Sequence, residues 1–189
     1  LYLFIGITDA IVRINTERFK PNRSQKRTEK AHRHLEIRIL KPAFVAAHYT
    51  LYMAYQSQRH AGGGMDNDNV EQYQQFLLQS RVNTRMVEFW DVSASGDRLV
   101  MVSIIDVLSD GISAVYTFYD PTVKSGLGTF NVLWQIQQAK VLELPNVYLG
   151  YWIEKSPKMN YKCHFGGQEH LIDGEWLPAP RRPVTEMNE

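Results

Sequence analysis

The sequence predicts a mixed α/β (α+β) fold, in which helices flank a mixed β-sheet. Three observations predict it. Between residues 86 and 120, the strand-like runs MVEFWDV, RLVMVSIIDV and SAVYTFYD are separated by SASGD and LSDG, which are typical turn sequences. A helical pattern with glycines at its start then runs from SGLGT to about Val141. The strand-like run NVYLGYWI follows Pro145, which ends the helix.

Five elements are expected before residue 86. AIVRI (10–14) and LEIRIL (35–40) alternate in polarity, which indicates short strands. NRSQKRTEKAHRH (22–34) is rich in helix formers but has no apolar stripe. NVEQYQQFLLQS (69–80) predicts a helix that begins at an Asn or Asp cap. A longer helical pattern between Pro42 and about His60 places one set of residues on a common face, namely Phe44, His48, Leu51, Tyr52 and Tyr55.

The order of the later elements predicts a particular architecture. Three antiparallel strands, a helix opened by glycines and one more strand is the order of an N-acyltransferase core of the acetyltransferase type (GNAT-like). We therefore expect a smaller basic N-terminal segment at residues 1–41 and an acyltransferase-like core at 42–177. The end of the chain, 178–189, contains PAPRRPVTEMNE and is expected to be disordered.

Charge is unevenly distributed along the chain. The net charge of the 189 residues is +1, but residues 1–60 hold eleven Lys/Arg and four Asp/Glu, a net charge of +7. The remaining residues have a net charge of −6. This asymmetry predicts either a polyanion-binding surface in the N-terminal third or a solvated basic helix.

Cysteine content and hydropathy limit the environment. The single cysteine, Cys163, excludes an intrachain disulfide, and we expect it to be a small packed residue. No apolar run has the length of a membrane span, and no signal peptide is visible. We therefore expect a cytoplasmic protein that does not contact a membrane, and the oligomeric state stays open.

The glycines before the last helix form a candidate anion site. Ser125, Gly126, Gly128 and Thr129 would lie where backbone N–H groups and the helix dipole point outward, with Ser125 as the N-cap. The alternative is that these glycines serve only the turn.

Several short motifs together resemble a known family. They are AVYTFYDP, LGT, YLGYWI and KMNYK, with FKPNRSQKR, YQSQRH and VEF earlier in the chain. As a set they resemble the aminoacyl-tRNA–protein transferases of the N-end rule, across roughly residues 10–176. The compact length is similar to the bacterial branch, which transfers leucine to N-terminal Asp or Glu and so marks proteins for degradation. Arginyl transfer is the nearest alternative.

The resemblance implies that aminoacyl-tRNA is the donor and that the acceptors are proteins with an acidic N-terminal residue. No cofactor is needed for the transfer step. Family members carry an N-terminal cysteine cluster, thought to hold an iron–sulfur centre or another metal. No cysteine precedes Cys163 here, so we assign no metal ligand and expect such a centre only in a cluster that this sequence lacks.

The resemblance also implies a site built largely from aromatic residues. Those expected near the ester are Tyr119, Asp120, Tyr151 and Tyr161. Those expected to bind the substrates, besides the four residues of the anion site, are Arg59, His60, Tyr116, Trp152 and Lys162. Alternative roles stay open. About half of the aromatic residues on one strand would be core, Asp120 could be a turn acid, and Arg59 and His60 could simply complement a helix dipole.

The basic stretch would contact tRNA phosphates through Arg23, Lys26, Arg27 and Lys30. Two further classes of function compete with aminoacyl transfer. One is an acyl-CoA-dependent N-acetyltransferase, whose pyrophosphate would use the same anion site but leave the basic helix without a role. The other is a non-catalytic tRNA-binding module.

Overall fold

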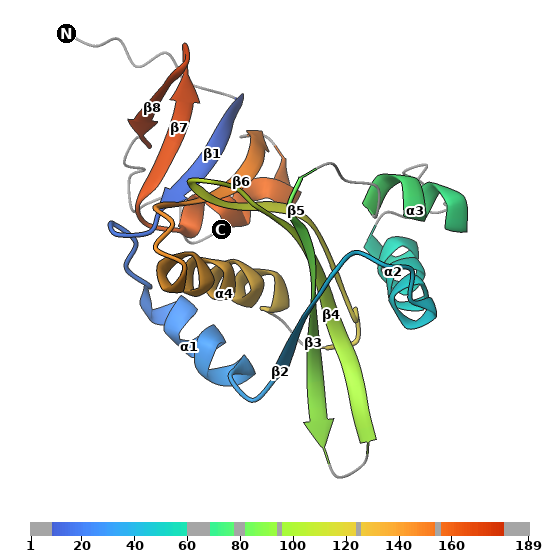
Figure 1. Cartoon of the computed structure of the whole chain (residues 1–189). Coiled ribbons are helices and arrows are strands. Elements are labelled where there is room, and N and C mark those ends of the chain that lie inside the picture. The colour runs from blue at the N-terminus through green and yellow to red at the C-terminus, as the bar shows by residue number, and fades with distance from the viewer. Residues whose placement is uncertain are drawn as a thin grey trace, which may run out of the picture.

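The computed structural model describes residues 9–59, 69–77, 82–93, 96–123, 126–153 and 156–179. Eight strands form one sheet in the order β2-β3-β4-β5-β6-β1-β7-β8 (Figure 1). Only the β5–β6 pair is parallel among the recorded pairs. The strands are β1 (Asp9–Asn15), β2 (Glu36–Leu40), β3 (Thr84–Ser93), β4 (Gly96–Val107), β5 (Gly111–Tyr119), β6 (Asn146–Ile153), β7 (Gln168–Ile172) and β8 (Glu175–Pro178).

Helices cover both faces of this sheet (Figure 1). They are α1 (Arg23–His32), α2 (Ala46–Arg59), α3 (Val70–Leu77), α4 (Leu127–Val141) and the 3-10 helix η1 (Pro157–His164). The mixed α+β fold class and the antiparallel β3–β4–β5 meander are thereby confirmed. No helix among the described residues is long and apolar enough to cross a membrane.

The meander separates two hydrophobic clusters because successive side chains of a strand point to opposite faces. Met86 of β3 and Phe118 of β5 pack with the α2 and α3 residues Leu51, Tyr52 and Tyr73. On the other face, Val87 and Phe89 of β3 pack with α4 through Phe130, Leu133, Trp134 and Ile136. Helix α4 is therefore buried on much of its surface, as its apolar sequence requires.

The predicted helical face of α2 is largely confirmed. His48, Leu51, Tyr52 and Tyr55 are all buried. Phe44 is the exception, because α2 begins at Ala46 and Phe44 lies before it with 43% of its surface exposed. Helix α3 begins after Asn69, as predicted, and the side chains of Asn69 and Gln72 each bond the other's backbone N–H at 2.9 Å.

The parallel pair diverges soon after it begins. Strand β5 pairs with β6 only from Gly111↔Asn146 to Ser113↔Tyr148. Beyond that point β5 pairs with β4 as far as Tyr119, and β6 pairs with β1 as far as Ile153. Helix α4 connects the two strands, so its N-terminus and the start of η1 lie at the same carboxyl end of the sheet. In open α/β sheets this end is where ligands bind.

The N-terminal segment belongs to the same sheet. Strand β1 lies between β6 and β7, and β2 pairs with β3 at one edge. The boundary expected at residue 41 stays a prediction. Strands β7 and β8, of five and four residues, were not predicted. Most of the expected tail, 180–189, lies outside the described residues.

Candidate active site between helices α2 and α4

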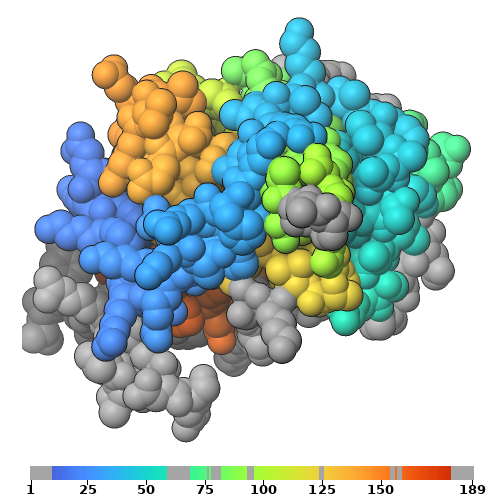
Figure 2. Space-filling view, turned by 90° about the horizontal axis from the view of Figure 1, so that it is seen from below, coloured from blue at the N-terminus to red at the C-terminus, as the bar shows by residue number. Residues whose placement is uncertain are grey.

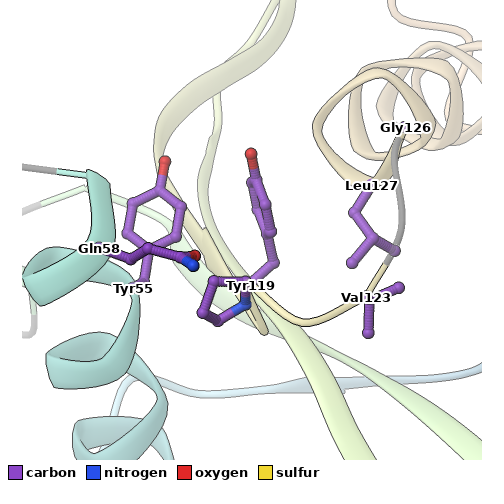
Figure 3. Close-up of a pocket in the computed structure, with 7 residues that line it drawn as sticks. Tyr55, Gln58, Tyr119, Val123, Gly126 and Leu127 are labelled. Carbon is purple, nitrogen blue, oxygen red and sulfur yellow. The ribbon is translucent and has the colours of Figure 1, made fainter.

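A pocket of about 230 Å³ lies between α2, the end of β5 and the start of α4 (Figure 3). The rings of Tyr55 and Tyr119 stand edge to face, with centroids 4.9 Å apart. In Figure 3 their hydroxyl groups point in the same direction, and Val123 and Leu127 form the wall beyond Tyr119. The residues that line the pocket are Tyr55, Gln58, Tyr119, Pro121, Val123, Gly126 and Leu127.

A buried polar contact holds α2 in place. His48 Nε2 lies 2.5 Å from Glu88 Oε1 of β3, and the His48 side chain is fully buried. The other oxygen of Glu88 accepts a 2.8 Å hydrogen bond from the indole N–H of Trp90. Tyr55 lies seven residues after His48, which is about two helical turns, so the same face of α2 that meets Glu88 also presents Tyr55 to the pocket.

Helix α4 begins differently from the prediction. Ser125 was expected to be the N-cap, but the N-cap is Gly126, with φ +97° and no side-chain hydrogen bond. Only glycine adopts this φ at little cost. Ser125 itself lies outside the described residues. Gly128 and Thr129 are half-buried in the first turn, and a Cβ added to Gly128 would lie 3.9 Å from the ring of Tyr119.

The basic helix α1 packs against this helix start. A Cβ added to Gly126 would lie 3.2 Å from Thr28 Cγ2 and 3.5 Å from His32 Nε2. At its other end, α1 donates a 3.1 Å hydrogen bond from Gln25 Nε2 to the carbonyl oxygen of His164 in η1. Helix α1 therefore spans from α4 to η1, and it is exposed in Figure 2. Its predicted tRNA contacts, Arg23, Lys26, Arg27 and Lys30, are all exposed.

Asp120 occupies a turn rather than the pocket. It pairs with Arg98, and its Oδ1 accepts hydrogen bonds from Thr122 N at 2.8 Å and Thr122 Oγ1 at 2.7 Å. Burial alone would raise the pKa of Asp120, but the hydrogen bonds from Thr122 and Arg98 together lower it below its ordinary value. A carboxylate held ionised in this way is suited to stabilising the turn. Its role as a base stays an untested prediction.

The aromatic strand β6 divides its residues between surface and core. Trp152 is only 4% exposed, and its ring lies 5.6 Å from that of His170. Tyr151 is 69% exposed, and Tyr161 of η1 is also exposed. Among the described lining residues of the pocket, none comes from β6 or η1. The burial of Trp152 agrees with the alternative that part of the aromatic residues on this strand are core, and its role in substrate binding stays a prediction. Tyr151 and Tyr161 are accessible to a ligand.

Lys162 lies where β6 has left β5. Its ammonium group donates to the carbonyl oxygen of Leu149 at 2.7 Å and to that of Tyr151. Burial lowers the pKa of Lys162 from its ordinary value. The ammonium has three N–H donors, and its bonds to described residues use two of them.

The other predicted residues are placed as follows. Tyr116 is half-buried and packs against Tyr52 at 6.2 Å between ring centroids, so it belongs to the α2 cluster. The side chain of Arg59 and the whole of His60 lie outside the described residues. Five lining residues of the pocket were not predicted as site residues, namely Tyr55, Gln58, Pro121, Val123 and Leu127. For these residues the sequence gave one indication, which is the predicted helical face on which Tyr55 lies.

Metal binding finds no support in the described part of the chain. No three His, Cys, Asp or Glu side chains gather there in a metal-binding arrangement. Cys163 is half-buried in η1. The described residues therefore do not fit a cysteine-bound cluster.

This mixed α+β fold occurs in solved structures, of which two are examples. One is L-PGS from Bacillus licheniformis, with a TM-score of 0.53 and 11% identity over 78% of this chain and 48% of that one. The other is a C-terminal domain assigned to lysylphosphatidylglycerol synthetase from Agrobacterium fabrum, with a TM-score of 0.54 and 8% identity over 83% and 50%. At these identities the likeness concerns the fold alone.

Sequence comparison identifies the family. The family profile described as arginine-tRNA-protein transferase, C terminus, matches residues 47–172. Relatives named aspartate/glutamate leucyltransferase include one from Polynucleobacter necessarius, 51% identical over 87% of this chain and 66% of its own length. Another, from Thiobacillus denitrificans, is 52% identical over 87% and 68%. The chain belongs to this family of aminoacyl-tRNA–protein transferases, and it spans about two thirds of the length of these relatives.

Proposed function

We propose that this protein transfers leucine from leucyl-tRNA to the α-amine of proteins that begin with Asp or Glu. Its relatives carry the name aspartate/glutamate leucyltransferase. The observation that carries the proposal is the position of α1, whose Thr28 and His32 approach Gly126 while Gln25 bonds η1. A basic helix that touches both α4 and η1 would bring tRNA phosphates next to the pocket. We place the reaction in the cytoplasm, as its donor requires.

The transfer needs little chemical activation. The neutral α-amine attacks the ester carbonyl carbon, the new C–N amide bond forms, and the C–O bond to the terminal ribose breaks. A proton from the amine is transferred to the ribose oxygen, which becomes a hydroxyl group. Because the free α-amine has a pKa of about 7.7–8.0, part of it is already neutral at pH 7. Holding amine and ester in contact would therefore supply much of the rate.

A direct experiment tests the reaction. The protein is incubated with charged total tRNA and with peptides that differ only in their first residue, and the products are read by mass spectrometry. We expect leucine on peptides that start with Asp or Glu and none on their Asn, Gln or Ala counterparts. Equal modification of Asp and Ala peptides would refute the acceptor part of the proposal. In a parallel incubation with acetyl-CoA in place of tRNA, transfer of an acetyl group to the peptides would refute the donor part.

Lys162 is our candidate for the acceptor carboxylate. Two backbone carbonyls fix its ammonium group. The described residues provide no further partner, so its third N–H can meet a carboxylate beside the accessible Tyr151 and Tyr161. Hydrogen bonds to charged groups contribute about 1.5–3 kcal/mol. Lys162→Met should therefore raise the KM for an Asp peptide by about 10–100-fold, and it should narrow the preference for Asp over Asn. Lys41→Met, at an exposed lysine after β2, is the control. An unchanged Asp/Asn ratio would contradict this role.

The basic face of α1 is tested by its salt dependence. Replacing Lys26, Arg27 and Lys30 together by Ala should weaken tRNA binding and flatten the dependence of log K on log salt. The loss should be roughly 0.7–0.9 units of slope for each lost phosphate contact. Turnover at saturating tRNA should change little, because these groups hold the donor far from the ester. If the slope measured by filter binding stays the same, α1 is only a solvated helix.

A further inference from the structure

The volume of the pocket limits its ligand. Pockets that enclose drug-sized ligands measure about 300–1,000 Å³. At about 230 Å³, the pocket between α2 and α4 is smaller than these. It has room for a group of amino-acid side-chain size, and it is too small to enclose a whole nucleoside as well.

The walls of the pocket are apolar in part. Pro121, Val123 and Leu127 contribute aliphatic surface, Tyr55 and Tyr119 contribute phenol rings with their hydroxyl groups, and Gln58 contributes an amide (Figure 3). Among the described lining residues, none carries a charge. The carboxylate next to them in sequence, Asp120, is already bonded to Arg98 and Thr122. A guanidinium group in this pocket would lose hydration and would meet only neutral acceptors, such as the Gln58 amide, among the described lining residues, which is costly for a charge.

The position of the pocket connects it to the donor. Gly126 is both a lining residue and the point where α1 meets α4. A charged tRNA 3′ end guided by α1 would thus bring its aminoacyl group to the pocket. We propose that the pocket binds the side chain of the transferred leucine, and that Val123 and Leu127 make its walls selective against arginine. This inference rests on the proposed function for the identity of the donor.

Val123 offers the cleaner test, since it is half-buried whereas Leu127 is also part of the core. Val123→Phe should fill the pocket. We expect its affinity for leucyl-tRNA with a non-hydrolysable amide at the 3′ end to fall about tenfold or more, because single changes of this size in apolar pockets alter discrimination about 10–200-fold. Its affinity for uncharged tRNA should stay the same. Val115→Phe, at an exposed position of β5 outside the pocket, is the matched control.

A second variant tests charge instead of volume. Val123→Asp places a carboxylate in the pocket. When arginyl-tRNA and leucyl-tRNA compete as donors, the ratio of arginine to leucine transferred should therefore rise by about tenfold or more. Val115→Asp should leave this donor ratio unchanged. Circular dichroism must first show that the variants are folded. If one Val123 variant fails to fold, the other still decides.

The outcomes separate the pocket from the reaction. Suppose that the wild type transfers leucine, that Val123→Phe keeps the affinity for the leucyl-tRNA analogue, and that Val123→Asp keeps the donor ratio. The pocket assignment would then be refuted, whereas the proposed function would stand. If the wild type transfers no amino acid, the function fails. Binding still tests the pocket in that case. The wild type should bind the leucyl-tRNA analogue more tightly than uncharged tRNA, and Val123→Phe should lose this difference. A wild-type preference for arginyl-tRNA would overturn the pocket assignment.

Discussion

Tyr119→Phe is expected to lower turnover by about 10²–10³-fold while tRNA affinity stays the same. Tyr119 lines the pocket, and its ring packs edge to face on the ring of Tyr55 (Figure 3). If the leucyl side chain occupies the pocket, the ester lies at the pocket mouth, within reach of a phenol donor. A donor placed for the developing oxyanion contributes this factor because it acts mainly in the transition state. Single-turnover transfer with saturating leucyl-tRNA measures it.

Two comparisons make this result specific. Tyr49→Phe removes a hydroxyl from another ring of α2 that packs on Phe44 and Tyr73 outside the pocket, and it should leave turnover within a few-fold. Because Tyr119→Phe keeps the ring, the contact with Tyr55 should persist and the melting temperature should change little. An equal loss of turnover and tRNA affinity would instead indicate that the hydroxyl holds the donor in the ground state.

Glu88→Ala is expected to lower the free energy of unfolding by about 3–5 kcal/mol. Glu88 is buried and contacts both His48 of α2 and the indole N–H of Trp90. Removing one member of a buried pair leaves the other desolvated without its partner, and this produces losses of that size. Urea titration followed by far-UV circular dichroism gives the free energy, provided that the slope with urea is unchanged.

An exposed pair supplies the control for Glu88. Glu36 and Arg38 form a 2.7 Å ion pair on the edge strand β2, where both side chains are substantially exposed. Glu36→Ala should cost less than about 1 kcal/mol, because solvent screens such pairs. If both substitutions cost the same, the contact between His48 and Glu88 does not hold α2. In that case the placement of Tyr55 needs another explanation.

Local patterns predicted the elements that alternation and turn chemistry define. The meander β3–β4–β5, the helix after the glycines and strand β6 all follow from residues close together in sequence. The pocket does not, since Tyr55 and Tyr119 are separated by 64 positions and meet only because α2 crosses the meander. The divergence of β5 from β6 is likewise a property of the whole sheet.

The aromatic segment shows where residue type alone misleads. Tyr151 and Trp152 are neighbours of similar chemistry, yet one is exposed and the other is buried beside His170. A strand alternates its faces, so a run of aromatic residues cannot all line one cleft. Gly126 gives a second example. The serine before it has a better capping side chain, but the positive φ at the N-cap requires glycine.

The position of β1 between β6 and β7 imposes an order on the assembly of the chain during synthesis. Asn15 of β1 pairs with Asn146, 131 residues later, and Ile11 pairs with Leu171. At about 5–20 residues per second, a ribosome needs on the order of ten seconds to make the intervening chain. Until then β1 has neither neighbour and exposes unpaired backbone groups. Contacts so distant in sequence also slow folding. We therefore expect nascent chains that stop before β6 to depend on chaperones, whereas the β3–β4–β5 meander can pair as soon as it emerges.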